Sequence, residues 1–509
     1  MPQLHPPLVR PGEGAHDREH CDNARPQDWS NPRPRDPYHL LVIGAGPAGL
    51  VAARGAAMLG ARVALIESHL LGGDCLNYGC VPSKALIRTA RLYADMRDAA
   101  NFGARPPDDI RVDFPMAMER MRRIRARIGR VDSASRLSAE GIDVFFGAAQ
   151  FTSGDAVDVE GTRLRFKKAM IATGSRSILP TIPGLAEAGY LTNETVFDLT
   201  VLPGRLLVIG GGQVGCELAQ AFSRFGSRTV IAHDEPLFLP KEERDAAQMV
   251  AEALARDGVE IHLNTTAVSV RAQGGKKLVE TVNDGNVATI AADQILTGIG
   301  RAPAVAGLNL EAAGVVYDAN AGIRVDDFLR TANPRIYAAG DVCLEHQFAD
   351  AAVAAARIVV RNALVLGRQR VSALTIPWCT YTDPEIAHVG LYVKEARERG
   401  IAVKTFTVPM HDVDRAIADG EEDGFVKIHV REGSDTILGA TVVARHAGEM
   451  INGISLAMVA GIGLATVARV IHTYPTQAEA IRMAASNYTR TRSTPFLSWL
   501  RRKWVNVSQ

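Results

Sequence analysis

The sequence has no long hydrophobic run and almost no net charge. None of its apolar stretches approaches the roughly 20 residues that a membrane-spanning helix needs. Its 57 Lys and Arg residues are balanced by 56 Asp and Glu residues, for a formal net charge of +1. Proteins that bind nucleic acids usually carry a strongly basic face instead. We therefore expect a cytoplasmic protein with no nucleic-acid partner, and we do not expect membrane contact.

Cysteine is also scarce. The chain has 6 cysteines, and only Cys75 and Cys80 are close together in the sequence. This is not the cysteine framework of a small secreted domain. We expect a reducing compartment and one working pair of thiols.

Two segments of the chain repeat one pattern. VIGAGPAGLVAARGAAMLGARVALIE (42–67) aligns without a gap on VIGGGQVGCELAQAFSRFGSRTVIAH (208–233). Each reads as a strand, a glycine-rich turn, an amphipathic helix and a second strand. The chain of 509 residues is too long for one hydrophobic core. The repeat therefore predicts two nucleotide-binding βαβ units in separate domains.

The first repeat contains the pattern Gly44-x-Gly46-x-x-Gly49 directly after a strand. Such glycines permit a tight turn, the approach of a pyrophosphate and close packing of the helix on the strand. Glu67 ends the next strand, where a carboxylate can accept hydrogen bonds from a ribose diol. These features predict a nucleotide site.

The second repeat contains Gly210-x-Gly212-x-x-Gly215, and His233 stands where the first repeat has Glu67. An acid at this position is typical of NAD sites, and an arginine nearby is typical of NADP sites. Histidine is neither, so the sequence leaves NADH and NADPH equally open.

The segment LGGDCLNYGCVPSKAL holds Cys75 and Cys80 shortly after the first repeat. On a regular helix, residues five apart have Cα atoms about 8.7 Å apart, whereas a disulfide needs less than about 7 Å. The pair can close only if the backbone is distorted, and Gly79 makes this feasible. Lys84 follows Cys80 by one helical turn, and its charge would favour a thiolate.

Together these motifs resemble the class I pyridine nucleotide–disulfide oxidoreductases, which include glutathione reductase, dihydrolipoamide dehydrogenase and mercuric reductase. The resemblance runs from about Tyr38 to Tyr488. Further matching stretches are ATG at 172–174, GRAP at 300–303, TANPRIYAAGD ending at Asp341, YTDPEIAHVG and YPTQAE.

The resemblance implies FAD in the first domain and NADPH or NADH in the second. Cofactor contacts are then expected at Thr173, Gly174, Gly300 and Asp341, with Asp341 near the ribityl chain of FAD.

The resemblance also implies roles for four side chains. Cys80 corresponds to the thiol next to the flavin, and Cys75 to the thiol that meets the substrate. Lys84 and Glu217 match the family's ion pair near flavin N5.

The same resemblance predicts an α/β fold with two Rossmann-like nucleotide-binding domains, for FAD and NAD(P), and a C-terminal α+β domain that forms a homodimer. The expected divisions are a disordered tail (1–36), the FAD domain in two parts (37–195 and 319–372), the NAD(P) domain (196–318), the interface domain (373–488) and a basic aromatic tail (489–509).

One departure from the family pattern concerns the acceptor. The disulfide reductases carry a His-Pro-Thr-x-x-Glu motif, in which the histidine protonates a departing thiolate. Here Tyr474 takes the place of the histidine, followed by Glu479, while His472 lies two residues earlier. A phenol with a pKa near 10 is a poor proton shuttle at neutral pH.

Tyrosine at this position resembles the mercuric reductase branch. The soft Hg(II) ion prefers thiolate ligands, and Cys75 and Cys80 could supply two. The chain lacks that branch's C-terminal cysteine pair and its N-terminal CxxC metal-binding domain. The acceptor is therefore expected to be a metal ion or a small molecule. A disulfide reductase, a dihydrolipoamide dehydrogenase and a slow-turnover redox sensor remain alternatives.

Overall fold

The computed structural model describes residues 14–107, 109–365 and 367–492. It divides the chain into two units, which are treated separately below. Unit 1 comprises Met1–Pro236 and Asp257–Leu374, and unit 2 comprises Leu237–Arg256 and Thr375–Gln509. None of the helices in the described ranges combines the length and apolarity needed to cross a bilayer.

Unit 1 contains a seven-stranded sheet built on the first repeat. Its parallel part has the order β3-β2-β1-β6-β18, and β5 and β4 continue from β6 as an antiparallel extension. The strands are β1 (Tyr38–Ile43), β2 (Val63–Glu67), β3 (Ile142–Phe146), β4 (Ala149–Ser153), β5 (Ala156–Val159), β6 (Thr162–Ile171) and β18 (Ile336–Ala338). The apolar run of β2 is buried at every position, as expected for a parallel strand covered on both faces.

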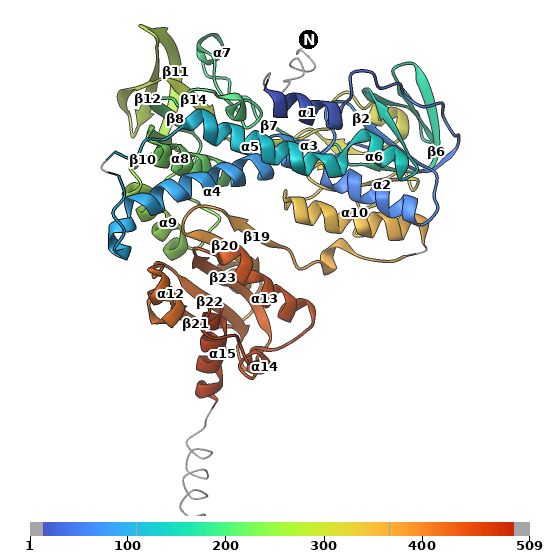
Figure 1. Cartoon of the computed structure of the whole chain (residues 1–509). Coiled ribbons are helices and arrows are strands. Elements are labelled where there is room, and N and C mark those ends of the chain that lie inside the picture. Colours follow the sequence, from blue (N-terminus) through green and yellow to red (C-terminus); the bar gives the residue numbers. More distant parts are fainter. Residues whose placement is uncertain (1–13, 108, 366, 493–509) are drawn as a thin grey trace, which may run out of the picture. The chain divides into compact units, whose positions relative to one another are not determined.

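Helices cover this sheet and continue beyond it. In Figure 1, α2 and α10 lie side by side, and α4 packs against both α5 and α8. The helices of this part are α1 (Ala15–Ala24), α2 (Pro47–Met58), α3 (Gly73–Asn77), α4 (Cys80–Arg97), α5 (Phe114–Gly129), α6 (Ala134–Ala139) and α10 (Ala349–Leu364).

The second repeat forms a four-stranded parallel sheet of order β10-β9-β8-β14. A three-stranded antiparallel sheet, β11-β12-β13, and two short strand pairs, β7-β15 and β16-β17, accompany it. The strands are β7 (Ser175–Ser177), β8 (Arg205–Ile209), β9 (Arg228–Ala232), β10 (Val259–His262), β11 (Thr265–Gln273), β12 (Lys276–Asn283), β13 (Asn286–Ala292), β14 (Gln294–Thr297), β15 (Arg301–Pro303), β16 (Tyr317–Asp318) and β17 (Gly322–Ile323); the helices are α7 (Leu185–Ala188) and α8 (Gln213–Phe225).

Unit 2 is an antiparallel sheet with helices packed on it, so the predicted α+β domain is confirmed. The strand order is β19-β20-β23-β22-β21. The strands are β19 (Pro377–Thr380), β20 (Glu385–Gly390), β21 (Val403–Pro409), β22 (Phe425–Arg431) and β23 (Ile437–Ala444); the helices are α9 (Arg244–Arg256), α11 (Val393–Glu398), α12 (Asp414–Asp419), α13 (Ala447–Val459), α14 (Leu464–Val467) and α15 (Glu479–Thr491).

The prediction of a disordered tail over residues 1–36 is wrong for residues 14–36. This stretch begins with α1, whose Asp17 and His20 side chains are buried. Trp29 then packs edge-on against Phe146 of the sheet. Ion pairs and hydrogen bonds, described below, hold the segment in place. Residues 1–13 lie outside the described residues, as do residues 493–509 of the predicted basic tail.

Two predicted boundaries of the NAD(P) domain also need correction. Residues Leu237–Arg256 belong to unit 2, where the buried carboxylate of Glu242 accepts a hydrogen bond of 2.6 Å from the Tyr392 hydroxyl. The predicted end at 318 is too late, because Val305, Leu310 and neighbouring apolar side chains are buried in the core under the first sheet.

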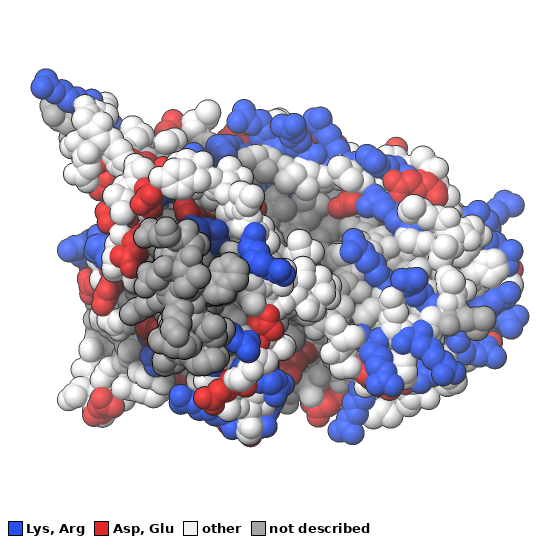
Figure 2. Space-filling view, turned by 90° about the horizontal axis from the view of Figure 1, so that it is seen from below, with Lys and Arg blue, Asp and Glu red and all other residues white. Residues whose placement is uncertain are grey.

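The charged residues are mixed on the surface. On the face shown in Figure 2, Lys and Arg side chains are numerous, and Asp and Glu side chains lie among them. This mixture agrees with the near-neutral net charge of the whole sequence.

Candidate redox and nucleotide sites

The first glycine turn is as tight as the sequence predicts. Gly44 has a φ of +98°, and a Cβ there would lie 2.3 Å from the carbonyl oxygen of Ala172. A Cβ on Gly49 would lie only 1.8 Å from the carbonyl oxygen of Gly44. Any side chain at these positions would push β1, β6 and α2 apart. The backbone is therefore shaped for the close approach of a dinucleotide.

Gly46 caps the N-terminus of α2, with Pro47 as the first helical residue. The backbone N–H groups of the first turn point out of the helix, which makes this end suitable for a pyrophosphate. The segment that carries the cysteines reaches the same turn, since a Cβ on Gly73 would lie 2.5 Å from the Cα of Gly46. The first glycine turn and the segment of the cysteine pair are thus neighbours.

The side chain of Glu67 holds this turn through hydrogen bonds to the backbone. One carboxylate oxygen accepts a hydrogen bond of 2.7 Å from the Ala45 N–H, and the other accepts one of 2.7 Å from the His69 N–H. Burial raises the pKa of Glu67, and the two backbone hydrogen bonds oppose that rise. The predicted ribose ligand is therefore also a structural part of the turn.

The second turn repeats this geometry. Gly210 has a φ of +108°, and a Cβ on Gly215 would lie 2.2 Å from the carbonyl oxygen of Gly210. Gly212 caps α8. His233 takes the place of Glu67, because its Nδ1 accepts a hydrogen bond of 3.3 Å from the Gly211 N–H. The fold of the predicted NAD(P) site is present, with an imidazole in place of the acid.

The two cysteines flank a break between helices, as their spacing requires. Cys75 lies in α3, which ends at Asn77, and Cys80 begins α4. Between them Gly79 has φ −129° and ψ −109° and makes no part of either helix. Both cysteines are free thiols in the structure, Cys75 partly buried and Cys80 exposed.

The thiols face each other, and their surroundings make them unequal. The hydrogen bond between them lowers the pKa of Cys80, and the positive charge of Lys84 lowers it further. The same hydrogen bond, together with burial, raises the pKa of Cys75. Of the two thiols, Cys80 is therefore the one that ionises more readily, which agrees with the prediction that it is the thiol next to the flavin.

The predicted ion pair is formed. Lys84 Nζ lies 2.7 Å from a carboxylate oxygen of Glu217, whose side chain is 5% exposed. Lys84 comes from α4, one turn after Cys80, and Glu217 comes from α8 of the second repeat. The pair connects the helix of the cysteines to the helix of the second glycine turn.

A polar chain that the sequence analysis missed links the FAD motif to the cysteines. The Ser175 hydroxyl donates to Asp341 at 2.7 Å, and Arg301 donates to Ser175 at 2.8 Å. Arg301 also pairs with Asp74 at 3.3 Å, and Asp74 directly precedes Cys75. Its only signal in the sequence was the arginine within GRAP.

The other predicted FAD contacts are neighbours in sequence of these polar residues, since Thr173 and Gly174 precede Ser175, and Gly300 precedes Arg301. Thr173 donates its hydroxyl to the carbonyl oxygen of Ala304 at 2.7 Å. Gly174 and Gly300 have φ values of +69° and +118°, which favour glycine. Burial raises the pKa of Asp341.

Tyr474 lies in unit 2, where its side chain is 65% exposed. Its hydroxyl donates a hydrogen bond of 2.9 Å to Asp414, which raises the pKa of the phenol. Glu479 forms an ion pair with Arg482. His472 is exposed, with Nδ1 3.2 Å from the Val470 carbonyl oxygen. In these contacts, Tyr474 pairs with Asp414, Glu479 pairs with Arg482, and His472 contacts neither of them.

Among the described residues, no group of three or more His, Cys, Asp or Glu side chains could hold a metal ion.

Two family models match the chain. One, described as pyridine nucleotide-disulphide oxidoreductase, matches residues 38–356. The other, described as the dimerisation domain of the same proteins, matches residues 376–485. Together they extend over almost all the described residues beyond the N-terminal segment.

Curated relatives are similar over most of their length. Mercuric reductase from Acidithiobacillus ferrooxidans is 34% identical over 96% of this chain and 88% of its own. Mercuric reductase from Streptomyces lividans is 34% identical over 89% of this chain and 96% of its own. Dihydrolipoyl dehydrogenase from Thermus scotoductus is also 34% identical, over 88% and 96%.

Solved structures share the fold. The Cu(II) complex of the HOCl-induced flavoprotein disulfide reductase RclA from Escherichia coli aligns with a TM-score of 0.79 and 30% identity, covering 87% of this chain and 99% of that one. LpdA from Mycobacterium tuberculosis aligns with a TM-score of 0.81 and 29% identity, covering 88% and 99%.

Proposed function

Because the chain belongs to the pyridine nucleotide–disulphide oxidoreductase family, we propose that it uses NAD(P)H to reduce a metal ion at Cys75 and Cys80, with Hg(II) as the leading candidate. Enzymes of this family use FAD and NAD(P)H. Bound flavin supplies the two-electron link between NAD(P)H and the cysteine pair. The balanced reaction is NAD(P)H + Hg(II) → NAD(P)⁺ + H⁺ + Hg(0).

The side chains around the pair support this assignment. The hydrogen bond from Cys75 lowers the pKa of Cys80 and so favours ionisation of one sulfur of the pair. A second thiolate forms when a soft metal ion displaces the Cys75 proton. Lys84, held by Glu217 at 2.7 Å, keeps a positive charge one turn from Cys80 and so favours the ionised sulfur.

The observation that carries the choice of acceptor is the hydrogen bond between Tyr474 and Asp414. A disulfide acceptor needs an acid to protonate its leaving thiolate, and Asp414 raises the pKa of the phenol at the position of that acid. Reduction of a metal ion breaks no S–S bond, so it needs no acid at this position. The named activities of the mercuric reductase relatives and the Cu(II) complex of RclA agree with a metal acceptor.

We also propose that the chain works as a homodimer. Unit 2 matches the family's dimerisation domain, and it exposes large apolar side chains that a second copy could cover. Leu456 and Val459 of α13 are 68% and 70% exposed, and Ile471, close to Tyr474, is 96% exposed. In such a dimer, Tyr474 of one chain would meet the cysteine pair of the other.

The first experiment compares acceptors. Purified holoenzyme is assayed for NAD(P)H oxidation with Hg(II) in excess thiol, with glutathione disulfide and with lipoamide. We expect Hg(II)-dependent oxidation, and disulfide turnover about 10² to 10⁴ below that of a histidine-bearing relative, the usual contribution of general acid–base catalysis. Cys75→Ser and Cys80→Ser should each abolish the Hg(II) activity.

Variants of Tyr474 and His472 then separate the two acceptor classes. We expect Tyr474→Phe and Tyr474→His to lower Hg(II)-dependent turnover, and Tyr474→His to raise disulfide turnover modestly. If the wild type instead reduces a small disulfide at hundreds per second, and His472→Ala removes this activity, the enzyme is a disulfide reductase that uses His472 as its acid.

A further inference from the structure

The N-terminal arm, residues 14–36, reaches the segment that carries the cysteines. Its helix α1 buries His20 completely and Asp17 almost completely. The arm continues along residues 68–71. The Leu71 N–H donates to the Ala24 carbonyl oxygen at 3.2 Å, and Arg25 donates to the Ser68 carbonyl oxygen at 2.6 Å.

Asn77, which lies between the two cysteines, is bound directly by the arm. Its side-chain oxygen lies 2.6 Å from Nε2 of His20. Its side-chain N–H groups donate to the carbonyl oxygens of Gly73 at 2.7 Å and Leu71 at 3.2 Å. Burial, with the charge of Arg125, lowers the pKa of His20 to about 4. The imidazole is therefore neutral at physiological pH, and its Nε2–H donates to Asn77.

The backbone of Asn77 is held through a second residue of the arm. Because α3 ends at Asn77, the carbonyl of this residue has no helical partner. It accepts instead a hydrogen bond of 3.0 Å from the buried guanidinium of Arg125. Arg125 is fixed by a 2.7 Å ion pair with Asp17. Both contacts that reach Asn77 from outside its own segment thus depend on α1.

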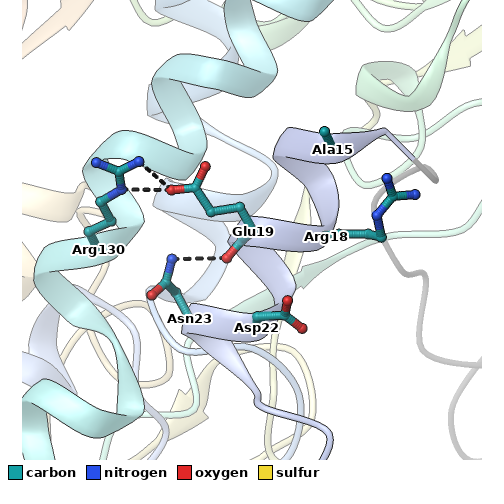
Figure 3. A pocket seen from close by; sticks show the side chains of 6 residues that line it. All are labelled: Ala15, Arg18, Glu19, Asp22, Asn23 and Arg130. Carbon is teal, nitrogen blue, oxygen red and sulfur yellow. Dashed lines mark hydrogen bonds and ion pairs between the residues drawn. The ribbon is translucent and has the colours of Figure 1, made fainter.

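The opposite face of α1 is ordinary surface. Figure 3 shows it lining a shallow pocket, with Glu19 paired to Arg130 and Asn23 bonded to the Glu19 backbone.

From this arrangement we infer that the N-terminal arm is a positioning element for the redox pair: His20, and Asp17 through Arg125, hold Asn77 at the helix break where Cys75 and Cys80 face each other. The inference rests on the proposed redox function of this pair.

A direct consequence concerns the equilibrium between dithiol and disulfide. In a regular helix, Cα atoms five residues apart lie about 8.7 Å apart, too far for a disulfide. Releasing Asn77 lets the break relax toward such a helix, which disfavours the disulfide. We expect His20→Ala to shift the dithiol–disulfide equilibrium at least tenfold toward the dithiol, equivalent to about 30 mV.

The test is a titration of holoenzyme in glutathione redox buffers, with the thiols counted by alkylation. His20→Gln is the rescue variant, because its side-chain amide can donate to Asn77, and it should restore most of the wild-type equilibrium. Trp29→Phe is the matched control. It removes a partly buried contact of the same arm, the hydrogen bond of 3.2 Å to the Val144 carbonyl oxygen, without touching Asn77.

The outcomes separate this inference from the proposed function. If the wild-type pair does not cycle between dithiol and disulfide, the proposed function fails. If it cycles and His20→Ala stays within twofold of it, or Trp29→Phe shifts the equilibrium equally, the arm is only a stabilising element. Should His20→Ala not fold, Asp17→Asn and His20→Gln are titrated instead, and an unchanged equilibrium in Asp17→Asn overturns the inference.

Discussion

The two glycine-rich turns share one backbone design but end on different side chains. In each, the middle N–H of the turn donates to the side chain that ends the second strand: Ala45 to Glu67 at 2.7 Å, and Gly211 to His233 at 3.3 Å. Glu67 uses its second oxygen for the His69 N–H. The second nitrogen of His233 is buried and has no hydrogen-bond partner among the residues that the structure describes.

This difference shows how many hydrogen-bonding atoms of each side chain are used to hold the turn and how many remain for a ligand. Both oxygens of Glu67 hold backbone, so the first turn needs its acid before any ligand binds. Since Nδ1 of His233 accepts a hydrogen bond, Nε2 of the neutral ring carries the hydrogen. A buried donor without a partner is costly, and an oxygen of a ribose hydroxyl or a phosphate could satisfy it. The second turn therefore leaves one polar group for its coenzyme.

We expect the greatest loss of cofactor binding from alanine substitutions at the closely packed glycines of the two turns. In Gly49→Ala the new Cβ would overlap the Gly44 carbonyl oxygen at 1.8 Å, and in Gly215→Ala it would overlap that of Gly210 at 2.2 Å. We expect the first variant to be purified without yellow colour. The second should retain FAD but lose at least about 10² in kcat/KM for NAD(P)H, the usual cost of misplacing a ligand by about 1 Å. Absorbance at 450 nm and stopped-flow reduction measure the two losses.

Matched controls lie at the other ends of the same helices. Gly60 and Gly226 have positive φ, which Gly49 and Gly215 do not, but a Cβ at either control position meets nothing within 4 Å. Alanine there should cost only about 1–2 kcal/mol of stability, with FAD content and NAD(P)H kinetics unchanged. If these controls lose cofactor as readily, then close packing is not the reason for the glycines in the turns.

A smaller effect is expected from the side chains beneath the turns. Glu67→Ala leaves the N–H groups of Ala45 and His69 without partners, at about 1–3 kcal/mol for each unsatisfied group. We expect FAD to bind at least about tenfold more weakly. His233→Ala removes only one long hydrogen bond and should leave FAD content unchanged. Equilibrium dialysis of FAD compares the two, and equal FAD loss would contradict the asymmetry between the turns.

The parts of the molecule that the sequence could predict are those fixed by local backbone geometry. Gly44 and Gly210 need positive φ, and the spacing of Cys75 and Cys80 requires a broken helix; the structure has all three features. Each of these three features depends on residues that are close together in the sequence, so it could be predicted before the fold was known.

The N-terminal arm could not be predicted because it is held by polar pairs over long sequence separations. The helix AHDREHCDNA has few apolar residues, which resembles a disordered segment. Its stability comes from Asp17 with Arg125, 108 residues away, and from His20 with Asn77. Glu242 joins unit 2 through Tyr392 in the same way, 150 residues away. The spacing of residues along the sequence does not show which distant polar residues will pair.

The last prediction concerns His233 and the choice between NADH and NADPH, where we expect only a small effect. The Nε2–H of this residue could donate to a 2′-phosphate oxygen or to a ribose hydroxyl, while the neighbouring Asp234 and Glu235 would repel the phosphate. The energies of these contacts nearly cancel, so we predict use of both coenzymes with less than about tenfold difference in kcat/KM, that is, below about 1.4 kcal/mol.

His233→Glu recreates the side chain of the first turn and should shift the ratio of kcat/KM values toward NADH, because a carboxylate accepts hydrogen bonds from the ribose diol and repels the phosphate. His262→Glu, at the end of the neighbouring strand β10 and partly exposed, adds the same charge as a control and should leave the ratio nearly unchanged. A wild-type preference of a hundredfold for either coenzyme would show that another group, and not the spare hydrogen of His233, selects the coenzyme.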